Sequence, residues 1–304
     1  MLFFLPLLRF GLGTNDYASL MAASALGLAA AFLTGGFSTV GRRLVGEAYS
    51  AGNVRGEATG FASLSVANAA ALGFALTMVA IYCWATGASM PFVIVAALPP
   101  ITGFFNTFDN VRAAYNEHYV TATLLIMLQL VMYAIGFLVP YTRQHLVVSA
   151  MLLSSPYMFA SLAALALLLR RRPYLIGGSA RLAWRVMREG TAYAVADGLL
   201  TATLSLAVVW VERSGRAETA AWFGTLVRLF QIFLVPIILL LLPLSSYIRV
   251  VWNARGVAEK RAFARTTLLV GLAYGALVAV ALLLISTLYI GGALKLRAPK
   301  TSSR

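Results

Sequence analysis

One long apolar stretch of the sequence carries an arginine deep inside it. The stretch covers 220–247, and Arg228 lies about 12 Å from its start at ~1.5 Å per helical residue. A cation at this depth in a membrane normally faces protein or water, so it marks a functional site. Gly224, Thr225, Arg228 and Gln231 have the spacing of one helix face. We therefore expect Thr225, Arg228 and Gln231 to line a polar cavity and bind substrate. The alternative is that Arg228 extends to the lipid headgroups.

A second polar stripe surrounds an acid in another apolar stretch, 190–211. Tyr193, Asp197, Thr201 and Ser205 recur every four residues, which places them on one helix face. A carboxylate inside a span can couple transport to a proton or Na⁺, or close a gate by pairing in one state only. The structural alternative is an acid near the membrane interface that caps the cavity.

Two amides are further candidates for binding substrate. We expect Asn68, and Gln129 with Tyr133, to line the interior of the first half of the chain. Each of these side chains alone is also typical of hydrogen bonding between membrane helices.

Charged residues at one helix connection suggest a gate. Asp109, Arg112 and Glu117 lie in FNTFDNVRAAYNEHY, where a gate-closing ion pair is one hypothesis and a solvated loop is the other. The single cysteine, Cys83, and two separated histidines give no ligand set, so we expect neither a metal site nor a cofactor.

The elements that position these residues are membrane-spanning helices. Hydrophobic residues make up 61% of the 304 residues and occur in runs of ~20. This composition predicts an all-α polytopic membrane protein and excludes a soluble enzyme, while the continuously apolar runs exclude a β-barrel. Residues 1–13 are expected to form a short helical stub. We predict eight full spans, at 18–37, 60–84, 91–108, 118–139, 147–169, 190–211, 220–247 and 266–290. Pro99-Pro100 makes 91–108 the weakest of them.

The net charge of +14 arises mostly from basic residues in the connections between spans. By the positive-inside rule these connections are cytoplasmic, and they attract anionic membrane lipids rather than nucleic acid. The basic connections are 38–59, 109–117, 170–189 and 248–265. The segment 171–189 is expected to be a linker or an interfacial helix. It separates an N-terminal lobe, 1–170, from a partial C-terminal lobe, 190–304.

Several stretches carry a family resemblance. They are LGTNDYASL at 12–20, the Gly35-Gly36 pair taken as the end of the first span, the loop RRLVGEAYSAGNVRGEA and the stretch FLVPIILLLLPLSSYIRVVWNARG. Together they resemble the Wzx-type polysaccharide flippases of the multidrug/oligosaccharidyl-lipid/polysaccharide exporter superfamily. The similarity covers nearly the whole chain. Full-length members have further helices, so the chain is expected to lack helices at both ends.

The resemblance implies a transporter without enzymatic activity. Such a protein carries a polyprenyl-pyrophosphate-linked oligosaccharide from the cytoplasmic to the outer leaflet of the cell inner membrane, by alternating access of two helical lobes. It supplies surface polysaccharide (O-antigen) synthesis, with a polysaccharide polymerase as a partner. Arg228 matches the cationic cavity residue that meets the pyrophosphate, since a guanidinium binds phosphate oxygens bidentately and stays charged.

Three other functions stay open. A cation-coupled multidrug exporter of the same superfamily would use Asp197 as its coupling site. A membrane-embedded glycosyltransferase or polymerase is disfavoured, because the external connections are short. The chain could also be an inactive remnant.

Overall fold

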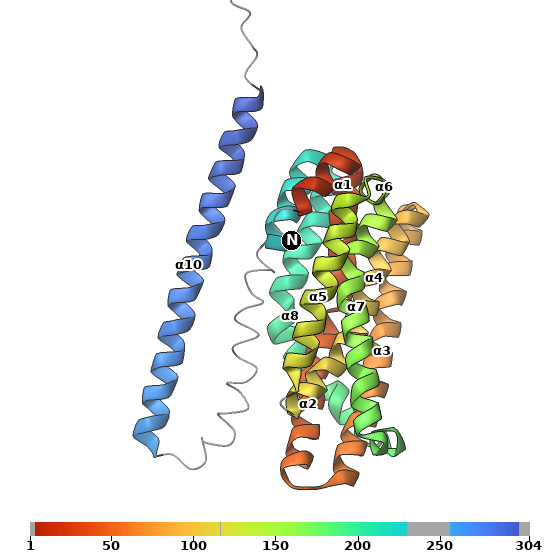
Figure 1. The fold of residues 1–304 in the computed structure, drawn as a ribbon, viewed down its shortest axis with the longest axis vertical. Coiled ribbons are helices and arrows are strands. Elements are labelled where there is room, and N and C mark those ends of the chain that lie inside the picture. Colours follow the sequence, from red (N-terminus) through yellow and green to blue (C-terminus); the bar gives the residue numbers. More distant parts are fainter. Residues whose placement is uncertain (1–3, 116, 230–255, 298–304) are drawn as a thin grey trace, which may run out of the picture. The chain divides into compact units, whose positions relative to one another are not determined.

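The computed structural model describes residues 4–115, 117–229 and 256–297, and in this part the chain forms helices and no strand (Figure 1). The chain divides into two units, Met1–Thr225 and Leu226–Arg304. The helices that bear on function, α1 to α8, all lie in the first unit. The second unit contains α10 (Val257–Arg297), which includes the predicted span 266–290.

The N-terminal segment is one bent helical pair. It consists of α1 (Phe4–Ala30), which has a non-helical kink at Gly13, and α2 (Phe32–Ser50), which meets α1 at 43°. The prediction of a stub, a span ending at 37 and a loop from 38 is therefore wrong in its boundaries. The basic residues after 38 lie on a helix because its other face is apolar, with Phe37, Val40 and Val45 buried.

The Gly35-Gly36 pair does not end a helix, which is a second correction. It lies inside α2, where Gly36 meets α8 (Ala183–Arg213). A Cβ on Gly36 would lie 2.0 Å from the carbonyl oxygen of Gly190, and one on Gly190 would lie 2.5 Å from the Phe37 ring. Glycine therefore allows the two backbones to approach closely.

Most of the predicted spans in the first half are present as long apolar helices. Four helices are long and apolar enough to cross a membrane, and the bent pair α1–α2 would make a fifth. They are α3 (Val54–Thr86), α4 (Met90–Ala114), residues Val120–Leu138 of α5 (His118–Leu138) and α7 (Leu146–Arg171). The chain thus has the helices of a multi-pass membrane protein. The full set of eight spans and the two lobes remain predictions.

The proline pair does not interrupt α4. Pro99 and Pro100 lie inside this continuous helix, at the point where it packs against α1. A Cβ on Gly27 of α1 would lie 2.9 Å from the Pro99 ring, so the missing side chain leaves room for the proline. Packing against α1 thus accommodates a residue that weakens an isolated helix.

The segment after α7 turns back into the helix bundle. A short 3-10 helix, η1 (Pro173–Gly177), is followed by α8, which packs against α1, α2 and α3. Arg185 and Arg188 therefore lie in the first turns of α8, and Arg181 lies just before it. An interfacial position of this segment remains a prediction. The short helix α6 (Tyr141–Gln144) joins α5 to α7.

A hydrophobic core lies where the α2–α3 turn, the end of α4, the end of α7, η1 and the start of α8 meet, at the lower end of the bundle in Figure 1. We call this end of the bundle the basic end, because the helix ends that carry the arginines described below also lie there. Its buried residues include Phe37, Phe61, Phe108, Leu168 and Leu175. This core fixes the helix ends that carry the charged groups described next.

Candidate functional site

Glu117 connects two helices at the basic end. It follows the end of α4, and its Oε2 lies 3.4 Å from Nη2 of Arg112. Two arginines at the end of α7 reach the same carboxylate, Arg172 at 3.0 Å and Arg171 at 3.6 Å. One acid therefore joins α4 to α7 through three cations.

Arg112 is the most deeply buried of these cations, because its side chain is 0% exposed. Its Nη1 donates to the carbonyl oxygen of Ala164 on α7, at 3.2 Å. The turn after α4 brings the acid back to it, since the Glu117 amide donates to the Arg112 carbonyl at 3.1 Å. A buried cation needs such partners, because desolvation costs several kcal/mol per ion.

Glu57 forms a second polar contact beside the first. It is 3% exposed in the first turn of α3 and accepts hydrogen bonds from the hydroxyls of Tyr115, at 2.9 Å, and Tyr174, at 2.8 Å. Burial, and then the hydrogen bond to Glu57, raises the pKa of both tyrosines. Both phenols thus stay protonated at neutral pH and donate to the carboxylate.

Arg172 connects Glu117 with Tyr115, the tyrosine that hydrogen-bonds Glu57. Its guanidinium carbon lies 3.7 Å from the centre of the Tyr115 ring, a cation–π contact, while it donates to Glu117. Burial lowers the pKa of Arg172, but the hydrogen bond and charge of Glu117 outweigh it, so the pKa is raised overall. We call these residues the basic-end cluster, which consists of Glu57, Arg112, Tyr115, Glu117, Arg171, Arg172 and Tyr174.

A separate ion pair joins α2 to α8. Glu189 contacts Arg43 of α2 and accepts a hydrogen bond from Arg185, one turn earlier on α8, at 2.7 Å. These two cations, Arg185 before Arg43, lower the pKa of Glu189. The groups are partly exposed, so the pairs contribute little to stability and mainly fix the register of the two helices.

Asp109, the third member of the predicted gate, lies one turn before Arg112 on α4 and is half-buried. The ion pair between Arg112 and Glu117 is present, and the opening and closing of a gate there remains a prediction.

The two amides predicted to bind substrate lie in spans. Asn68 is fully buried; its Nδ2 donates to the Phe104 carbonyl at 2.8 Å, and its Oδ1 accepts from the Thr107 hydroxyl at 3.2 Å. Asn68 therefore hydrogen-bonds α3 to α4, as polar groups between membrane helices do. Gln129 is half-buried on α5. A contact of either residue with substrate remains a prediction.

The stripe around Arg228 is described only in part. Residues 217–229 form a helix in which Gly224 packs on Met21 of α1 and the Thr225 hydroxyl is 2.9 Å from the Tyr17 hydroxyl. Arg228 follows the boundary between the two units and is half-buried. Gln231 and the side chain of Asp197 lie outside the described residues. The binding role of Arg228 and the coupling role of Asp197 stay predictions.

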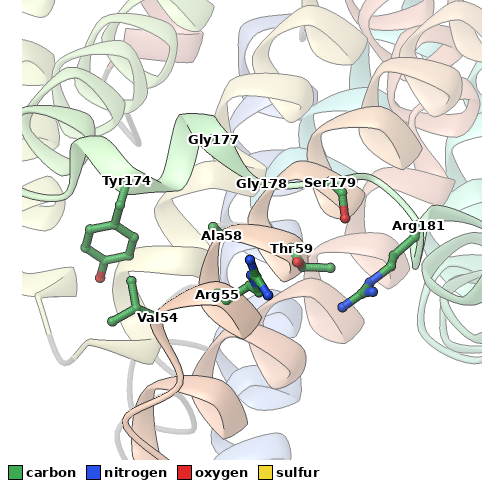
Figure 2. A pocket seen from close by; sticks show the side chains of 9 residues that line it. All are labelled: Val54, Arg55, Ala58, Thr59, Tyr174, Gly177, Gly178, Ser179 and Arg181. Carbon is green, nitrogen blue, oxygen red and sulfur yellow. The ribbon is translucent and has the colours of Figure 1, made fainter.

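A pocket of about 570 Å³ lies next to the basic-end cluster, between the start of α3 and the segment that leads from η1 to α8 (Figure 2). A Cβ on Gly178 would lie 1.9 Å from the Ala58 carbonyl oxygen, so glycine lets this segment lie against α3. The pocket is lined by Val54, Arg55, Ala58, Thr59, Tyr174, Gly177, Gly178, Ser179 and Arg181.

The sequence identified Arg112 and Glu117 because they are charged residues beside apolar spans, but it did not identify Glu57, Tyr115 or Tyr174. Glu57 is an acid in a basic connection, and no spacing relates it to tyrosines 58 and 117 positions later. Only the packing of α3 against α4 and η1 brings them together.

Comparisons with protein-family models, curated proteins and solved structures found no significant match to this chain. The functional argument therefore depends on the sequence and on the geometry of the basic end.

Proposed function

We propose that this protein is a transporter of the inner membrane that moves a polyprenyl-pyrophosphate-linked oligosaccharide from the cytoplasmic to the outer leaflet, for surface polysaccharide synthesis. The observation that carries the transport part is the basic-end cluster. It joins the ends of α3, α4, α7 and η1 through ion pairs and hydrogen bonds. In this proposal it is the closing contact of a cytoplasmic gate.

The chemistry of the cluster suits a contact that breaks and forms again. The Glu117 and Arg172 side chains are 15% and 17% exposed, and Arg171 is 57% exposed. Water can therefore replace these ion pairs and hydrogen bonds when the helix ends separate. Alternating access requires such a contact on one side of a central site.

The substrate class is supported by the resemblance of the sequence to polysaccharide flippases and by the arginine inside the 220–247 stretch. A guanidinium at that depth suits a pyrophosphate, because it stays charged when desolvated and binds two phosphate oxygens at once. The basic-end cluster would admit the headgroup from the cytoplasmic leaflet, and Arg228 would hold it within the membrane.

Transfer of a polyprenyl-pyrophosphate oligosaccharide across sealed vesicles that contain only this chain tests the proposal. We expect transfer by the native chain, loss of transfer in Arg228→Gln, and unchanged transfer in the matched control Arg216→Gln. Arg216 is exposed and lies outside the apolar stretch. Absence of transfer by the native chain would contradict the proposal. Gradient-driven export of a cationic dye instead would identify the multidrug exporter.

A further inference from the structure

The pocket beside the basic-end cluster has the composition of an anion site. Arg55 comes from the first turn of α3 and Arg181 from the segment before α8, so two separate elements each contribute a cation. In Figure 2 the two guanidinium groups lie on either side of the Thr59 side chain. No acidic side chain lines this pocket. Glu57, which is next in sequence to the lining residue Ala58, accepts hydrogen bonds from two tyrosine hydroxyls.

Among the polar groups of this pocket, the Tyr174 hydroxyl donates to Glu57, whereas Arg55, Arg181 and Thr59 have no side-chain partner within the described part of the chain. Arg43, Arg112 and Arg172 at the same end all pair with glutamates, whereas Arg55 and Arg181 make neither an ion pair nor a hydrogen bond there. Thr59 is only 4% exposed, and its hydroxyl also has no hydrogen-bond partner among the described residues. Arg55 and Arg181 are exposed, and an anion with several acceptor oxygens would pair with both of them and accept from the Thr59 hydroxyl.

The backbone at the start of α3 also favours an anion in this pocket. The pocket lies at the N-terminus of α3, where the first amides of a helix lack intrahelical acceptors and the helix dipole is positive. The Asn53 side chain caps the Gly56 amide, at 2.9 Å, which leaves the earlier amides to other acceptors. Phosphate groups are commonly bound at such positions.

The surroundings of the pocket indicate that the phosphate belongs to a lipid. Val54 lines the pocket and is 52% exposed, Ile176 is 69% exposed in η1, and Trp184 is 71% exposed near the start of α8. Exposed apolar and tryptophan side chains beside basic residues are typical of the level of lipid headgroups. The same pocket wall continues along α3 directly into a span.

We propose that this pocket binds the phosphate of an anionic membrane lipid, with Arg55 and Arg181 holding the phosphate oxygens and Thr59 donating a hydrogen bond. The apolar side chains around the entrance contact the acyl chains. The site lies against Tyr174, so a bound lipid would stabilise η1 and with it the closed basic-end cluster. This site does not depend on the proposed transport function.

Lipid binding to the purified full chain in detergent micelles tests this site. The chain is titrated with phosphatidylglycerol, with diacylglycerol as a phosphate-free control, and binding is measured by native mass spectrometry. A second arm adds inorganic phosphate as a competitor, which separates a lipid ligand from a soluble one. The pocket variant is Arg55→Gln with Arg181→Gln. The matched control is Arg170→Gln with Arg188→Gln, which removes the same charge from exposed positions at the same end.

We expect the pocket variant to bind phosphatidylglycerol about tenfold more weakly or worse, as the loss of one charge-assisted hydrogen bond alone would cause. The control should bind as the native chain does. Thr59→Val, which keeps the shape of the side chain, should also weaken binding, and it serves as the second test if the double variant unfolds. Equal binding by the native chain and the pocket variants would overturn the proposal, as would an equal loss in pocket and control variants. Binding of inorganic phosphate as tight as that of the lipid would overturn the lipid as the source.

Discussion

At the scale of single residues, Glu117 is the acid that holds the ion pairs of the basic-end cluster together. It accepts contacts from three arginines on two helices, and one of them, Arg112, has no exposed side-chain surface. Removing its charge would take from Arg112 a carboxylate 3.4 Å away, while the guanidinium stays buried beside the Ala164 carbonyl. Loss of a charged partner of a buried cation is far more costly than the loss of a surface pair.

We predict that Glu117→Gln lowers the free energy of unfolding by about 2 kcal/mol or more. The matched control is Glu47→Gln, whose carboxylate is 59% exposed and lies 3.8 Å from Arg43, and it should change the stability by less than about 0.5 kcal/mol. Denaturant unfolding in detergent, followed by circular dichroism, measures both. Equal stability of the two variants would show that Glu117 does not compensate Arg112.

The two tyrosines of the basic-end cluster give a pH prediction. Their pKa values are raised in the folded state by burial and by Glu57. The stability that they contribute is therefore fully present below the unfolded pKa of about 10, and it is lost as the pH rises from there through the folded pKa.

Phenolate absorbance measures this directly. Near pH 10, Tyr174→Phe should lose less phenolate absorbance than a control variant does, because burial and Glu57 raise the pKa of Tyr174. The control is Tyr141→Phe, at a position that is 61% exposed. An equal loss of phenolate absorbance in Tyr174→Phe and Tyr141→Phe would contradict the raised pKa of Tyr174.

The residue scale also shows what the sequence could reveal about the site. Arg112 and Glu117 were found because they interrupt apolar sequence within five positions of each other. Their partners Arg171 and Arg172 follow more than fifty positions later and meet Glu117 only because α7 packs against α4. Local patterns contain no information about such contacts, so the pocket and the tyrosine pair were also missed.

At the scale of elements, α2 shows how charge and periodicity can be confused. The sequence predicted a loop after 38 because arginines cluster there, but the structure continues the helix to Ser50. Its buried face carries the apolar residues, and Arg43 contacts Glu189 of α8. The cluster of arginines was interpreted as the end of a span, although these arginines lie within a continuous amphipathic helix.

The contact between α2 and α8 can be tested with adjacent glycines. We predict that Gly36→Ala destabilises the fold by about 1–3 kcal/mol, because its Cβ would lie 2.0 Å from the Gly190 carbonyl oxygen and the helices must separate. Gly35→Ala is the matched control, because its Cβ would have no neighbour within 4 Å. Thermal unfolding of the two variants in the same detergent compares them. Helix propensity alone favours alanine at both positions, so a similar change in both variants would show that the close contact with Gly190 does not decide the effect.

At the scale of the whole molecule, hydropathy predicted the class of the protein and the chain order of its apolar helices. Four apolar helices lie at or near predicted spans, including α4 despite its proline pair. The bent pair α1–α2 includes the predicted span 18–37 but has other boundaries. The arrangement of helices into lobes depends on contacts between distant segments, which a single sequence does not contain. The stretch around Arg228 continues beyond the described residues, so its cavity remains a prediction.

The most direct test of this account is whether the basic-end cluster opens during transport. Ser161 is 2% exposed on α7, on the same face as Ala164 and Leu168 beneath the cluster. In a Cys83→Ser background, Ser161→Cys is labelled by a membrane-impermeant maleimide added on the side of the basic end. We predict slow labelling of this cysteine when the native cluster is present. With Glu117→Gln, labelling should be at least about tenfold faster, because a factor of ten corresponds to a closed state weakened by ~1.4 kcal/mol. The polyprenyl-pyrophosphate oligosaccharide should change the native rate. A rate that neither the substitution nor the substrate alters would contradict a gate at this end of the protein.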